Sequence, residues 1–152
     1  MNDITIRNAE ISDLPILLQF EQGIIKAERP FDPTLAADPI SYYDIKKLIT
    51  DSSSKVVVAV ISDTIVGSGF AVVLNSKPYL AHQKYVNLHF MFTDPKYRGM
   101  GINNLIIHEL KQWAFAQEIF EIRLTVYEDN SSDIKAYEKA GFKKHIIEMR
   151  LL

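Results

Sequence analysis

The chain has 152 residues, which suits a single domain spanning residues 1–152 with a substantial buried core. A net charge of −2 and the lack of cysteine give no sign of a nucleic-acid binder, a disulfide scaffold or a cysteine-ligated metal. A polar, acidic start and the absence of a long apolar run predict a cytoplasmic protein that does not engage membranes.

The first third of the chain predicts one strand and two helices. Residues 4–7 form a short strand, and residues 11–28 carry apolar side chains at helical spacing. Three prolines between residues 29 and 39 disfavour helix and predict a loop. A second helix is expected over residues 41–51, with Ser41 as its N-cap.

The rest of the chain alternates strands with helices. Residues 55–61 are a β-branched run typical of a strand covered on both faces, and residues 65–74 complete a hairpin with it. Further strands are expected at 84–93, 120–127 and 142–152, and helices after Gly101 and over 131–141. The order β-α-α-β-β-β-α-β-α-β indicates a mixed α/β (α+β) fold with a central sheet.

The stretch DPKYRGMGINN, residues 94–104, lies between the strand 84–93 and the next helix. A helix N-terminus exposes free N–H groups with partial positive charge, so it attracts phosphate. Gly99 and Gly101 would let the backbone approach an anion, and Arg98 adds a cation. Taken alone, a plain turn with a solvated Arg98 is the simpler interpretation, because short motifs often match by chance.

A second segment, EDNSSDIKAYEKAGF (residues 128–142), makes a phosphate-binding loop the better interpretation than a plain turn. The two segments together closely resemble the GNAT-type N-acetyltransferases, which transfer acetyl from acetyl-CoA to an amine. The first is similar to their Q/R-x-x-G-x-G/A pyrophosphate loop, and the second to their N-x-x-A-x-x-L-Y-E-K-x-G-F segment. The matching residues are Arg98, Gly101, Asn130, Tyr137, Glu138, Lys139, Gly141 and Phe142. The order of elements fits from Ile4 to Phe142, so the resemblance covers nearly the whole chain.

The sequence departs from the family pattern at several positions. Asn103 stands at the last small position of the pyrophosphate loop, and Asp133 and Ala136 replace the usual alanine and leucine. One terminal strand is expected where many relatives have two. The sequence leaves open whether the acceptor site is completed by another subunit, as in a homodimer.

The resemblance implies a sheet splayed between its fourth and fifth strands, with acetyl-CoA held at the opening. Backbone groups at the end of the strand 84–93 would bond the pantetheine arm, the glycine loop would hold the pyrophosphate, and Asn130 would bond the arm. The implied contacts are Met91, Phe92, Thr93, Arg98, Gly99, Met100, Gly101, Ile102, Asn103, Asn104 and Asn130. Four scattered histidines suggest no metal site.

Within the resemblance, Tyr137 would protonate the departing thiolate as general acid. A phenol with a pKa of ~10 suits a thiol of ~8.5. For the general base, His89 is the best candidate because it titrates near neutrality, while Glu21, Glu128 and an ordered water stay open. The two-residue period of a strand would place His89 and Met91 on the same face.

The acceptor amine is expected to bind the loop between the first two helices. Its candidate contacts are Glu28, Arg29, Phe31, Tyr42 and Tyr43, which combine a carboxylate for an ammonium with aromatic rings. The predicted function is acetyl transfer to a primary amine of a small molecule or peptide. The alternative is a regulatory module that binds acetyl-CoA without turnover.

Overall fold

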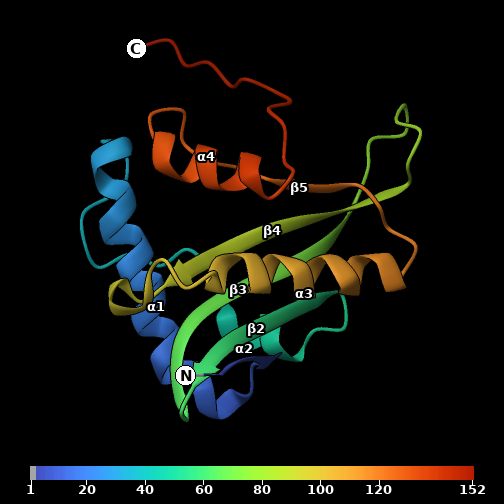
Figure 1. The fold of residues 1–152 in the computed structure, drawn as a ribbon. Coiled ribbons are helices and arrows are strands. Elements are labelled where there is room, and N and C mark those ends of the chain that lie inside the picture. Colours follow the sequence, from blue (N-terminus) through green and yellow to red (C-terminus); the bar gives the residue numbers. More distant parts are fainter. Residues whose placement is uncertain (1–2) are drawn as a thin grey trace.

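The computed structural model describes residues 3–152 and contains one five-stranded sheet (Figure 1). The strands, in the order in which they pair, are β1 (Ile4–Asn8), β2 (Ser54–Ile61), β3 (Thr64–Asn75), β4 (Lys84–Thr93) and β5 (Ile122–Leu124). Neighbouring strands are antiparallel except β4 and β5, which are parallel. The mixed α/β fold predicted from the sequence is confirmed.

Helices cover both faces of this sheet (Figure 1). They are α1 (Leu14–Glu28), α2 (Ile45–Thr50), α3 (Ile102–Ala116) and α4 (Ser131–Lys139), with short 3₁₀ turns η1 (Ile11–Asp13), η2 (Arg29–Phe31) and η3 (Pro95–Tyr97). The helices α1 and α2 pack on one face, and α3 packs on the other. No helix within residues 3–152 is long and apolar enough to cross a membrane.

The strand β2 shows why its sequence is continuously apolar. Val57, Ala59 and Ile61 belong to the core under α3, whereas Val56 and Val58 belong to the core under α1 and α2. Both faces of the strand are therefore buried, as its β-branched run predicts.

The second helix begins later than expected. Asp44, and not Ser41, is its N-cap, and the Asp44 carboxylate accepts a hydrogen bond from the Lys47 N–H at 3.3 Å. Both residue types cap helices well. The choice follows from the chain before Asp44, because Glu21 holds the Tyr42 and Tyr43 backbone outside the helix.

A bulge in β4 changes which side chains share a face. Phe90 has a φ of 62°, and the pairing of β3 with β4 shifts by one residue beside it. Met91 consequently packs against the core under α3, while Phe90 and Phe92 belong to the opposite core. The expectation that Met91 shares a face with His89 is therefore wrong, because a bulge interrupts the two-residue period.

The last predicted strand is not part of the sheet. Residues 142–152 form no strand or helix, and all of residues 143–152 are exposed. The segment has strand-like composition, but a strand requires a partner that supplies backbone hydrogen bonds. The predicted strand 120–127 is also shorter than expected, because only Ile122–Leu124 pair with β4.

Candidate active site

The sheet opens between β4 and β5. These strands pair only from Val86 to Leu88 of β4, and β4 then continues to Thr93 with no strand on that side in the described part of the chain. Backbone N–H and C=O groups of this stretch that point away from β3 have no strand partner there and can bond a ligand. Met91, Phe92 and Thr93, the predicted pantetheine contacts, lie along this opening.

The chain after β4 turns at two glycines before it enters α3. Gly99 and Gly101 have φ values of 81° and 79°, and Gly101 is the N-cap of the helix. No side chain caps the α3 N-terminus, and its first turn contains no acidic residue. Its first N–H groups are therefore available to an anion, with positive helix-dipole charge behind them.

Neighbouring side chains suit a pyrophosphate at this helix end. Arg98 is exposed and pairs with no carboxylate in residues 3–152. Ile102 is buried and anchors the helix against Gly67, where a Cβ would come within 2.9 Å of the Ile102 side chain. Asn103 is half-buried, and Met100 and Asn104 are exposed. The site thus offers free N–H groups and a cation on a rigidly seated helix.

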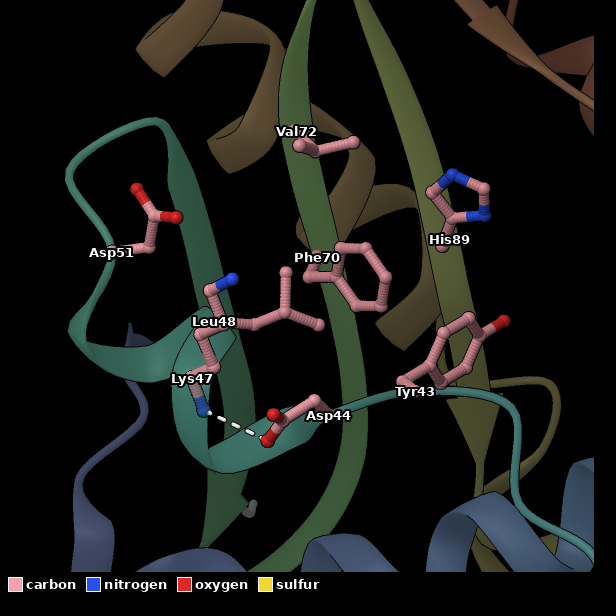
Figure 2. A pocket seen from close by; sticks show the side chains of 8 residues that line it. All are labelled: Tyr43, Asp44, Lys47, Leu48, Asp51, Phe70, Val72 and His89. Carbon is pink, nitrogen blue, oxygen red and sulfur yellow. Dashed lines mark hydrogen bonds between the residues drawn. The ribbon is translucent and has the colours of Figure 1, made fainter.

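An aromatic pocket lies on the α1 and α2 side of the sheet (Figure 2). Its open volume is about 350 Å³, and its walls include Tyr43, Phe70 and His89. The His89 ring stacks on Phe70 with centroids 5.0 Å apart, and Tyr43 meets Phe70 edge-on at 4.9 Å. Burial lowers the pKa of His89, so the imidazole is neutral at pH 7.

Glu28 occupies an acidic, partly buried position at the end of α1. Burial raises the pKa of Glu28, the Tyr42 hydroxyl opposes this, and the charges of Asp133 and Asp32 raise the pKa further. The Tyr42 hydroxyl is buried and makes no hydrogen bond of good geometry with a described residue. Glu28 therefore faces tyrosine and carboxylate neighbours drawn from three parts of the chain.

Tyr137 joins this group from α4. The ring is half-buried and meets Phe142 edge-on, with centroids 5.9 Å apart. Burial raises the pKa of Tyr137, and the charge of Asp133 and then that of Glu28 add to the rise. Burial, followed by the charges of Glu28 and Glu21, raises the pKa of Tyr43 to about 12. The structure thus brings Tyr137, Glu28 and Tyr43 into one electrostatic neighbourhood.

The Asn130 side chain caps the start of α4. Its Oδ1 accepts from the Asp133 N–H at 3.2 Å, and its Nδ2 donates to the Asp133 carboxylate at 2.9 Å. Asn130 is thereby the N-cap of the helix that carries Tyr137. Its position in the family motif is consistent with this capping role.

The remaining acceptor candidates separate into two groups. Phe31 stacks on Tyr127 at 6.2 Å, and the Tyr127 hydroxyl donates to Asp32 at 2.9 Å. Arg29 instead pairs with Asp38 at 2.6 Å and lines a second hollow that shares no residue with the aromatic pocket. Sequence reasoning missed Asp32 and Tyr127, because no local motif marks two residues 95 positions apart.

Glu21, one of the base candidates, is a positioning residue. It is 1% exposed, and its Oε2 accepts from the backbone N–H groups of Tyr42 at 3.0 Å and Tyr43 at 2.8 Å. The bonds tie α1 to the loop that carries the two tyrosines predicted to contact the acceptor. Glu128, by contrast, is exposed.

Glu21→Ala is expected to lower the free energy of unfolding by about 2–4 kcal/mol, because it removes a buried side chain and leaves two partly buried N–H groups unpaired. The released loop should also raise KM for the amine more than KM for acetyl-CoA. Urea unfolding and steady-state kinetics measure these effects. Gln19→Ala, an exposed change on the same helix, should stay within about 0.5 kcal/mol. Equal stability of the two variants would contradict the assignment.

Comparisons with known proteins agree with this geometry. The model of the acetyltransferase (GNAT) family matches residues 22–142. In residues 3–152, no three histidine or carboxylate side chains gather as a metal site. No curated protein matched the sequence.

Several solved structures share the fold. A tetramutant of the BH1408 protein from Bacillus halodurans aligns with a TM-score of 0.86 and 21% identity, covering 97% of this chain and 99% of that one. A predicted acetyltransferase from Clostridium acetobutylicum, solved with acetyl-CoA, aligns with a TM-score of 0.74 and 18% identity over 99% and 96%. An aminoglycoside 6′-N-acetyltransferase from Acinetobacter haemolyticus gives 0.75 and 12% over 97% of each chain.

The similar solved structures support the fold, and the match to the family model shows the family to which the chain belongs. That model spans most of the chain, including the aromatic pocket, the glycine loop and Tyr137. The chain therefore belongs to the GNAT family and is an acetyl-CoA-dependent N-acetyltransferase.

Proposed function

We propose that this protein transfers acetyl from acetyl-CoA to a primary amine held between α1 and α4, with Tyr137 as general acid. The observation that carries the proposal is the opening of the sheet between β4 and β5, together with the uncapped N-terminus of α3 that follows β4. Tyr137, Glu28 and Tyr43 come from three separate parts of the chain, and besides burial the charge of Glu28 raises the pKa of both tyrosines.

The groups proposed to hold acetyl-CoA are mostly backbone. Residues 91–93 would bond its pantetheine arm, and residues 98–104 would bond its pyrophosphate. Asn130 would act mainly through α4, by fixing the helix that presents Tyr137. Acetyl-CoA supplies an activated acyl group, and the chain supplies its orientation and the proton transfers.

The proposed reaction begins with an ammonium in the acidic neighbourhood of Glu28. The ammonium gives one proton to a base, which returns it to solvent. The free amine nitrogen then bonds to the acetyl carbonyl carbon as the carbon–sulfur bond breaks. The leaving sulfur takes the Tyr137 hydroxyl proton, and the second proton lost from nitrogen restores the phenol.

Two groups compete for the role of base. His89 is neutral and lines the aromatic pocket, but its ring packs on Phe70 and Tyr43. Glu28 has a raised pKa, and its negative charge contributes to the raised pKa of Tyr137. Glu28 is our choice, and the assignment of His89 stays a prediction that the same experiment tests.

Glu28→Gln is expected to lower kcat about 10²-fold, the scale of a lost general base. Wild-type kcat/KM should fall as the pH drops through the pKa of Glu28, which lies above that of an ordinary glutamate. The variant should lose this acidic limb. His89→Gln, the matched control, should lose less than about tenfold and keep the limb. The reverse pattern would assign the base to His89.

We further propose a cationic acceptor, either a small molecule or a peptide amine. Glu28, Asp32 and Asp133 place negative charge around the site, which favours an ammonium over a neutral or anionic acceptor. Two structurally similar proteins are aminoglycoside acetyltransferases by name.

An acetyl-CoA-dependent screen of amines by mass spectrometry tests the proposed function. The panel should contain polyamines, aminoglycosides, amino-acid amides and peptides, and calorimetry should measure CoA binding beside ATP and NAD. We expect CoA binding and acetylation of at least one cationic amine. Failure to bind CoA would refute the proposal. Binding without any transfer would favour the regulatory module.

A further inference from the structure

The aromatic pocket is built by packed elements on the α1 and α2 side of the sheet (Figure 2). Its apolar and aromatic walls come from the loop before α2, from α2 itself, from β3 and from β4, and they are Tyr43, Leu48, Phe70, Val72 and His89. Phe70 is the most buried of these, at 3% exposed, and the other four are half-buried. A hollow with such walls offers a ligand mainly apolar contact.

The three rings of the pocket are set at angles that suit a further flat ring. The planes of His89 and Phe70 lie 28° apart, and the Tyr43 ring stands at 90° to Phe70 and 63° to His89. Aromatic rings prefer offset-stacked or edge-to-face packing, so a ring parallel to one wall would meet the other edge-on. A linear alkyl chain would gain burial in the pocket but none of these ring contacts.

The pocket is large enough for an aromatic ring and the start of its linker. Its open volume is about 350 Å³. A cavity of roughly 150 Å³ lined by apolar side chains is enough to bind benzene. The remaining volume is therefore available for the chain that joins the ring to an amine.

The charged groups at the rim already have partners in the pocket wall. The Asp44 carboxylate caps α2 by accepting from the Lys47 N–H at 3.3 Å. The Asp51 carboxylate accepts from the Ser53 N–H at 2.9 Å and from its hydroxyl at 2.8 Å. These Ser53 bonds, and to a smaller extent the Lys47 ammonium, lower the pKa of Asp51. The rim therefore gives a ligand little unpaired charge, and the apolar walls determine what the pocket binds.

Tyr43 connects the aromatic pocket with the group proposed to bind the amine. Its ring is one wall of the pocket, and the charge of Glu28 adds to the effect of burial in raising its pKa. After burial and the charges of Asp133 and Glu28, the charge of Tyr43 adds in turn to the raised pKa of Tyr137. An acceptor with its ammonium near Glu28 can therefore extend along Tyr43 into the pocket.

We propose that the acceptor is an amine that carries an aromatic ring, which lies against Tyr43, Phe70 and His89 while the amine lies beside Glu28. The inference rests on the proposed function, because it names the substrate class of the same site. Hydroxyl-rich acceptors are disfavoured, because a hydroxyl buried against these walls loses its hydrogen bonds to water. Small arylalkyl amines are the expected class.

Matched pairs of amines test the requirement for a ring. Phenylethylamine and phenylbutylamine are compared with ethylamine and butylamine, which keep the amine and the linker but lack the ring. For the better aryl amine, kcat/KM should exceed that of its partner about tenfold or more, mainly through a lower KM, because the ring is bound equally in the ground state and the transition state. Kanamycin, a hydroxyl-rich aminoglycoside, should fall at least about tenfold below that aryl amine.

Val72→Phe tests whether the ring binds in this pocket. The larger side chain narrows the pocket, so the ratio of kcat/KM for the better aryl amine to that of its partner should fall at least about fivefold. Leu74→Phe is the matched control, because it enlarges a side chain of the same strand outside the pocket, and it should change this ratio by less than about twofold. Urea unfolding should show that both variants fold.

The outcomes separate this inference from the proposed function. Equal kcat/KM for the two members of each pair would refute the aromatic class and leave the proposed acetyl transfer standing. Acetylation of no amine, with or without a ring, would refute both. Equal falls of the ratio in Val72→Phe and Leu74→Phe would refute the placement of the ring in the aromatic pocket.

Discussion

Tyr137→Phe is expected to reduce kcat about 10²–10⁴-fold, the range typical for loss of a general acid. The change removes one hydroxyl and keeps the half-buried ring against Phe142. The affinity for acetyl-CoA should therefore stay within a few-fold of the unaltered protein. Stopped-flow or steady-state release of CoA measures the rate, and calorimetry measures the affinity.

The rates of the unaltered enzyme and of Tyr137→Phe should differ in how they depend on pH. Burial and nearby negative charge raise the pKa of Tyr137, so its hydroxyl stays protonated above the range of an ordinary phenol. The unaltered enzyme should accordingly keep its activity into alkaline solution, and the rate should fall only as the pH rises through this raised pKa. The variant should show no such alkaline limb.

Tyr127→Phe is the matched control. Tyr127 is also partly buried and also lies near carboxylates, but its hydroxyl donates to Asp32 and orders the acceptor loop. Its loss should raise KM for the amine and leave kcat within about tenfold. If both changes reduce kcat equally, Tyr137 has no special role in proton transfer. If neither does, thiolate departure needs no acid from this helix.

Gly101→Ala is expected to weaken CoA binding at least about tenfold, because in the proposed site the N-cap backbone lies close to the pyrophosphate. The φ of 79° at Gly101 also disfavours an L side chain by about 1–2 kcal/mol. A Cβ at Gly101 would meet nothing within 4 Å. The protein should therefore fold with only a modest loss of stability, and the effect should appear mainly in ligand affinity.

Gly141→Ala separates backbone strain from ligand obstruction. Gly141 has a φ of 105° and the same open space for a Cβ, but it follows α4 and is no part of the turn into α3. The two variants should lose similar stability in urea unfolding, whereas only Gly101→Ala should lose affinity for CoA by calorimetry. Equal affinities would argue against a pyrophosphate at the start of α3.

The features that the sequence predicted correctly are local ones. The apolar run of β2 predicted a strand buried on both faces, because each side chain reports directly on its own environment. The glycines after β4 predicted the turn into α3 and its free N-terminus, because a positive φ there favours glycine. Each signal depends on residues within a turn or two of one another.

The sequence predictions were wrong where contacts between distant residues determine the local structure. No glycine marks the bulge at Phe90, which appears only when β3 and β4 pair, and it moves Met91 to the other face of the sheet. The cap of α2 shifts to Asp44 because Glu21, over 20 residues earlier, holds the Tyr43 backbone. Residues 142–152 have the composition of a strand but pair with no strand of the sheet.

The sequence by itself therefore determined the family and the order of the elements as far as α4, since these depend on local backbone preferences and short motifs. Only the tertiary structure grouped Tyr137 with Glu28, assigned Glu21 to positioning and left the β5 edge free. These features depend on burial, charge and strand pairing between residues far apart in the chain. These interactions form only once the sheet and the helices have packed against each other.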